Sequence, residues 1–111
     1  MKLKTLSIAM MGLAAPGLVA ADELLEMQKN DNNWVMPAGD YANTRYSELT
    51  QITKDNVKDL NMAWSFSTGV LRGHEGNALV MDGTMYVHTA FPNIVFALDL
   101  NNDGAIKWKY E

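Results

Sequence analysis

The amino-acid sequence predicts an all-β fold behind a short helical arm, and three observations support this prediction. After residue 61 the apolar side chains alternate with a period of two, which is typical of strands. Gly-containing turn sequences separate the apolar runs. A tryptophan, one spacer and an aromatic residue occur in two places, so that Trp64 and Trp108 lie 44 residues apart. Because propeller blades repeat at roughly 40 to 50 residues, we expect the start of a β-propeller.

Residues 1–21 have the features of an export signal. Lys2 and Lys4 make a positive start, residues 6–19 are apolar, and small residues precede the expected cleavage after Ala21. The apolar run is shorter than the roughly 20 residues that a membrane-spanning helix needs. We therefore expect an exported protein with no membrane span once the signal is removed.

Charge and cysteine usage exclude several classes of function. The whole chain carries a formal charge of -4, and loss of the two lysines in residues 1–21 lowers it to -6, with 7 basic and 13 acidic residues left. An acidic chain without a basic cluster is not expected to bind nucleic acid. The chain has no cysteine, which excludes disulfides, thiolate metal sites and cysteine nucleophiles.

Residues 22–61 are predicted to form an arm with short helices. Acids at the start and a lysine at the end favour a helix over residues 22–29. Residues 30–45 are rich in Asn, Asp and Gly, and we expect them to form an ordered loop anchored by Trp34. Apolar residues at spacings of about three to five then predict a second helix over residues 53–60, with a threonine as its N-cap.

Residues 62–111 are predicted to be strands joined by tight turns. The expected strands span residues 62–68, 78–81, 85–89, 93–100 and 105–110, with Asp82-Gly83 and residues 101–104 as turns. The first strand has no partner before it, as in propellers whose first strand completes the last blade and removes a free sheet edge. Two core tryptophans in an ordinary β-sandwich are the alternative interpretation.

Several spaced motifs resemble one enzyme family. They are Leu49-x-Gln51-Ile52-Thr53-x-x-Asn56-Val57-x-x-Leu60-x-x-Ala63-Trp64, Ser67-Thr68-Gly69, Gly73-His74-Glu75-Gly76 and Asp82-Gly83-x-Met85-Tyr86-Val87-His88-Thr89. Together they resemble the quinoprotein alcohol dehydrogenases that use pyrroloquinoline quinone (PQQ), and the methanol dehydrogenase large subunits in particular. Ala97-x-Asp99, with Gly104 and Trp108, resembles the tryptophan-docking repeat of that family's eight-bladed propeller, with a slightly longer loop. The resemblance covers residues 22–111.

The resemblance implies an activity, cofactors and partners. Members oxidise methanol or other primary alcohols and pass two electrons to PQQ and onward to a periplasmic cytochrome c, while a bound metal ion polarises the quinone. Residues 40–46, 70–72 and 91–95 look closer to the lanthanide-using branch than to the calcium branch. The resemblance further implies a periplasmic location and a homodimer for the full-length protein.

The resemblance implies one cofactor-binding residue in this chain, Glu75, which matches a glutamate that contacts the quinone. Gly73 and Gly76 would let the backbone come close to a flat ligand. Taken alone, these residues are better explained as a plain turn with a solvated acid. Ala78 stands where family members usually have a proline, so we expect a less rigid turn.

No catalytic or metal-ligating residue is expected in this chain. In the family, the adjacent cysteines that stack on the quinone, the metal-binding residues and the catalytic aspartate all match positions beyond Glu111. We therefore expect an N-terminal piece that is inactive by itself. His74 and His88 have no third ligand at metal-binding spacing, and His88 is expected to be an inner residue of its strand.

Two other interpretations stay open at this point. A noncatalytic periplasmic propeller scaffold would share the tryptophan repeat without needing the motif over residues 73–76. A truncated product that ends at Glu111 would have no enzymatic role.

Overall fold

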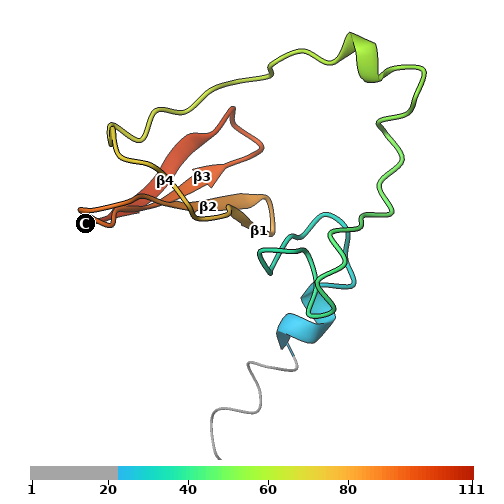
Figure 1. Cartoon of the computed structure of the whole chain (residues 1–111), viewed down its shortest axis with the longest axis horizontal. Coiled ribbons are helices and arrows are strands. Elements are labelled where there is room, and N and C mark those ends of the chain that lie inside the picture. Colours follow the sequence, from blue (N-terminus) through green and yellow to red (C-terminus); the bar gives the residue numbers. More distant parts are fainter. Residues whose placement is uncertain (1–22) are drawn as a thin grey trace, which may run out of the picture.

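The described part of the chain, residues 23–111, contains one antiparallel sheet preceded by a long arm (Figure 1). This computed structural model has four strands, β1 (Leu79–Met81), β2 (Thr84–His88), β3 (Val95–Asp99) and β4 (Ala105–Tyr110). Each strand pairs with the next along the chain, so the sheet is a meander. The last four predicted strands are confirmed, with shifts of at most two residues at their ends.

Two tight turns set the register of the sheet. The φ angles are 47° at Asp82 and 70° at Gly83, and 47° at Asp103 and 73° at Gly104. In the two-residue loop Asp82-Gly83, two consecutive positive φ values give a turn whose twist matches that of the flanking strands. Glycine adopts such angles without strain. Both predicted turns are therefore confirmed.

The hydrophobic core lies on one face of β3. Ile94, Phe96 and Leu98 are buried, with exposed fractions of 8%, 5% and 1%. The partly buried residues that pack against them are Trp64, Phe66, Val70, Met85 and Val87. The rings of Phe66 and Phe96 meet edge to face with centroids 5.0 Å apart, an arrangement that adds about 0.5–1.5 kcal/mol to area burial. The segment before the sheet thus covers its core face.

Residues 62–68 do not form a strand, which corrects the sequence prediction. Ladder hydrogen bonds need the edge of a neighbouring strand, and no strand among residues 23–111 pairs with this segment. The segment is held by its side chains instead. Trp64 packs on the last turn so closely that a Cβ added to Gly104 would lie 2.6 Å from Trp64 Cζ3.

The arm covers part of the free edge of β1. It begins with a helix over residues 23–27, within the predicted range. Trp34 and Val80 exchange two backbone hydrogen bonds of 2.8 and 3.0 Å. Asn33 Oδ1 accepts a hydrogen bond of 3.0 Å from the Asp82 backbone N–H. The expected anchoring of this loop is confirmed, and the arm shields an edge that could otherwise pair with another chain.

Residues 48–63 form an exposed arch away from the sheet (Figure 1). The predicted helix over residues 53–60 is reduced to a 3-10 turn, η1 (Val57–Asp59), whose N-cap is Asn56. The apolar residues expected to pack here are exposed, namely Leu49, Ile52, Val57 and Leu60. Short helices depend on tertiary packing, and the described residues provide no surface for these side chains.

The expected export signal, residues 1–21, lies outside the described residues. In the part that is described, no helix has the length and apolar character needed to cross a bilayer. Export therefore stays a prediction from the sequence.

We expect Gly104→Ala to lower the free energy of unfolding by about 1–3 kcal/mol more than Gly69→Ala, because the new Cβ overpacks against Trp64. Gly69 is a matched control, since both glycines have a φ of +73° but nothing lies within 4 Å of a Cβ added to Gly69. Urea unfolding followed by tryptophan fluorescence measures the difference. Equal losses for the two variants would contradict the packing of Trp64 on this turn.

We expect Asn33→Ala to lower the free energy of unfolding by about 1 kcal/mol, because the Asp82 N–H loses its acceptor. Hydrogen exchange at the Asp82 amide should speed up. Asn32→Ala is the control, because that side chain bonds within its own loop to Asn30. Unchanged protection of Asp82 in Asn33→Ala would show that the arm does not hold this turn.

Candidate functional site

Glu75 lies in an exposed segment, residues 71–77, between the core-covering segment and β1. Val70, which precedes this segment, packs on the core, and β1 begins shortly after the segment, at Leu79. No backbone hydrogen bond joins residues 71–77 to the rest of the described chain. The sheet therefore places the two ends of this segment, and side-chain contacts shape its middle.

Two side chains hold the first half of this segment. The Arg72 guanidinium lies 5.4 Å from the centre of the Phe91 ring, a cation–π contact. His74 Nε2 lies 3.3 Å from the Val70 carbonyl oxygen and 3.4 Å from Thr68 Oγ1. The contact with the carbonyl is a hydrogen bond when Nε2 carries the proton. His74 is thus engaged within its own loop.

The second half of the segment lies against β2. A Cβ added to Gly76 would overlap Cε1 and Nε2 of the His88 ring. His88 is exposed, so the expectation of an inner residue was wrong. Successive side chains of a strand point to opposite faces, and Val87 packs on the core. His88 therefore faces away from the core, and this alternation was the sequence signal that could have found it.

Two hollows meet at Glu75. Their volumes are about 440 and about 370 Å³, and Glu75, Gly76 and His88 line both. Tyr86 and Val95 give the larger hollow an apolar wall, whereas Thr89 and Asn93 line the smaller one with polar groups. The structure thus brings together the sequence-predicted residue and a histidine that sequence reasoning did not assign to the site.

The residues around Glu75 are suited to one polar contact with a flat ligand. The Glu75 carboxylate takes no part in the two ion pairs of the described chain, Lys29–Glu26 and Lys109–Glu111. Space is open beside Gly73. An exposed carboxylate next to an apolar wall can accept a hydrogen bond from a ring that lies on that wall. Within residues 23–111 no three His, Cys, Asp or Glu side chains group together as metal ligands.

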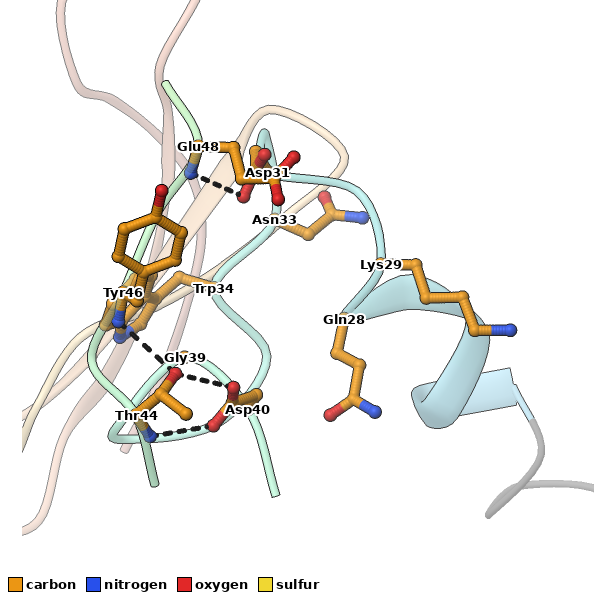
Figure 2. Close-up of a pocket in the computed structure, with 10 residues that line it drawn as sticks. All are labelled: Gln28, Lys29, Asp31, Asn33, Trp34, Gly39, Asp40, Thr44, Tyr46 and Glu48. Carbon is orange, nitrogen blue, oxygen red and sulfur yellow. Dashed lines mark hydrogen bonds between the residues drawn. The ribbon is translucent and has the colours of Figure 1, made fainter. Parts of the chain in front are cut away.

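A separate hollow of about 230 Å³ lies in the arm (Figure 2). Some of its polar groups are hydrogen-bonded to one another. Asp40 accepts hydrogen bonds from the Thr44 N–H at 2.9 Å and the Thr44 hydroxyl at 2.6 Å, and the Glu48 N–H donates to Asp31 at 3.3 Å. This hollow results from the folding of the loop, and Figure 2 shows that Glu75 is not among its lining residues.

Residues 34–111 match the sequence profile of the PQQ family described as glucose/ethanol/alcohol dehydrogenase, beta-propeller domain. The chain belongs to this family. The match confirms the family resemblance and the β-propeller class. The antiparallel sheet β1–β4 agrees with this class.

Two of the similar proteins are named methanol dehydrogenases. The chain is 57% identical over 106 residues to the lanthanide-dependent methanol dehydrogenase of Methylacidiphilum fumariolicum, covering 88% of this chain and 17% of that protein. It is 54% identical over 107 residues to methanol dehydrogenase [cytochrome c] subunit 1 of Methylobacterium organophilum, covering 93% of this chain and 17% of that protein.

A solved structure of a europium-containing methanol dehydrogenase is also similar. It superposes with a TM-score of 0.76 at 60% identity, over 80% of this chain and 16% of that one. The chain therefore spans 17% of the length of the curated relatives above.

We expect Thr44→Val to raise the pKa of Asp40. Hydrogen bonds from the Thr44 hydroxyl, and then from its backbone N–H, hold the pKa of this carboxyl below its ordinary value. The loop is therefore stabilised above the unfolded pKa, and this stabilisation is lost as the pH falls through the folded pKa. Titration of the Asp40 carboxyl carbon by NMR measures the change, with Ser47→Ala as control. An unchanged pKa in Thr44→Val would contradict the assignment.

Proposed function

We propose that this chain is the N-terminal part of a PQQ-dependent dehydrogenase that oxidises methanol or other primary alcohols. The observation that carries this proposal is the family match over residues 34–111, together with 57% identity to a lanthanide-dependent methanol dehydrogenase. Because the chain spans 17% of that relative, the activity belongs to the longer protein. The chain alone is inactive, because propeller blades bury their faces only against neighbouring blades.

Glu75 is the residue of this chain that contacts the cofactor in our proposal. When bound, PQQ supplies the two-electron acceptor for alcohol oxidation. The chain supplies binding and orientation: the Glu75 carboxylate accepts a hydrogen bond at the edge of the ligand, and the open space at Gly73 allows its approach. Tyr86 and Val95 form the apolar wall beside it.

The metal ion in this proposal is a lanthanide, with calcium as the alternative. A lanthanide-dependent enzyme and a europium-containing structure are among the similar proteins. The metal ligands, the adjacent cysteines and the catalytic aspartate would come from sequence that follows Glu111. This chain contributes neither catalytic nor metal-ligating residues.

The proposed architecture is an eight-bladed ring that residues 62–68 close. Residues 22–61 form the arm, and residues 62–111 form the closing strand and the first blade. One contact and one exposed side chain support this arrangement: Trp64 packs on Gly104, and Trp108, at the equivalent place in the repeat, is 47% exposed. A second blade would cover Trp108 as this one covers Trp64, and the last blade of the ring would give residues 62–68 the strand edge that they lack.

The proposed location is the periplasm, after export by residues 1–21. The electron acceptor is a cytochrome c, in keeping with the name of the Methylobacterium relative. We further propose that the full-length protein is a homodimer without a membrane span. Nucleic acid is not a partner, because the chain is acidic.

Sequencing the coding region past Glu111 tests the proposed enzyme. An open frame that encodes the adjacent cysteines and the metal-site acids is the expected result, and an Asp-x-Asp pair at the catalytic position would select a lanthanide. A continuing propeller without these residues would favour a noncatalytic scaffold instead. A stop codon directly after Glu111 would favour a truncated product without activity.

We expect Glu75→Gln in the full-length protein to weaken PQQ binding about tenfold, because a hydrogen bond to a charged group contributes about 1.5–3 kcal/mol. Titration of the apoprotein with PQQ, followed by absorbance, measures the affinity. Glu48→Gln is the control, since that carboxylate is exposed in the arm. Equal affinities for wild type and Glu75→Gln would remove Glu75 from the site.

A further inference from the structure

The contacts that hold residues 71–77 are made with different parts of the fold. Arg72 contacts Phe91, which lies in the connection between β2 and β3. His74 contacts Thr68 and Val70, which belong to the segment just before it. The contact of Gly76 with His88 reaches a strand of the sheet, β2. Glu75 stands directly between His74 and Gly76, so the strand contact is made by a residue adjacent to it.

The fit between Gly76 and His88 leaves no room for a side chain. A Cβ built on Gly76 would overlap Cε1 and Nε2 of the ring and would lie 2.8 Å from Nδ1. Gly76 does not have a positive φ angle. Glycine is therefore needed here because there is no space for a side chain. The edge of the imidazole ring therefore rests directly on the backbone of residue 76.

We infer that His88 is a positioning residue, whose ring sets the place of the Glu75 carboxylate between the two hollows. The inference rests on the proposed function, in which Glu75 contacts the quinone. His88 itself is held by strand pairing with Val95 of β3, so its ring links residues 71–77 to the sheet. Residues 71–77 lack backbone hydrogen bonds to the rest of the described chain, so the second half of this segment depends on side-chain packing.

Packing, rather than the charge or hydrogen bonding of the imidazole, is the role assigned to His88. In the structure, the His88 ring packs against the backbone of Gly76. A flat ring of similar size should therefore replace it. His88→Phe keeps such a ring, whereas His88→Ala removes the ring and its support of residues 71–77.

The test uses the full-length apoprotein, titrated with PQQ, and the absorption spectrum of the bound quinone. We expect about tenfold weaker binding for His88→Ala and a shifted quinone band, and less than about a twofold change for His88→Phe. Gly76→Ala should also weaken binding, because its Cβ displaces either the His88 ring or residues 71–77. In Gly76→Ala/His88→Ala the clash is gone, so the double variant should bind better than the sum of the two single effects predicts.

Each other outcome separates the inference from the proposed function. If Glu75→Gln weakens binding while His88→Ala and Gly76→Ala do not, Glu75 is in the site and His88 does not position it. If His88→Phe is as impaired as His88→Ala, while both unfold in urea like wild type, a ring nitrogen is at work and the packing role is wrong. If the two single effects simply add, the contact between residues 76 and 88 is not coupled and the inference fails. If none of the variants changes PQQ binding, including Glu75→Gln, the proposed role of Glu75 fails as well.

Discussion

The structure depends on covering one apolar face of β3. Phe96 and Leu98 are almost fully buried, and a small sheet is stable only when such a face packs against another element. Trp64 and Phe66 provide the cover, coming from a segment that makes no ladder hydrogen bonds with the sheet. The same tryptophan packs on Gly104 in the last turn. One side chain thus ties the start of residues 62–111 to their end.

This packing also decides where Glu75 lies. Val70 is the last residue of the segment that covers the core, and β1 begins at Leu79. On its other edge β1 pairs with the arm at Trp34. The segment that carries Glu75 therefore connects the covered face to an edge strand, and the His88 ring packs against it at Gly76. Its position is a consequence of the sheet, although the turn itself is exposed.

Much of the sheet could be predicted from local sequence, but the candidate site could not. Alternating side chains and the Asp-Gly pairs at residues 82 and 103 are enough to locate four strands and two turns. Glu75 became a candidate only through the family resemblance, because a glycine-flanked acid is also what a solvated turn contains. His88 was misplaced as an inner residue, although the inward position of its neighbour Val87 implied the opposite face.

The sequence by itself determined the family, the antiparallel meander and the chemistry of its turns, because these depend on neighbours within a few residues and on long spaced motifs. The tertiary structure alone decided that residues 62–68 lie on a sheet face without pairing, that residues 53–60 form little helix, and that His88 meets Gly76. A strand needs the edge of a neighbouring strand to pair with, and a short helix needs a surface to pack on. The His88 ring needs the space that a Cβ at residue 76 would fill. Each of these depends on residues far away in the chain, which periodicity and turn signals do not encode.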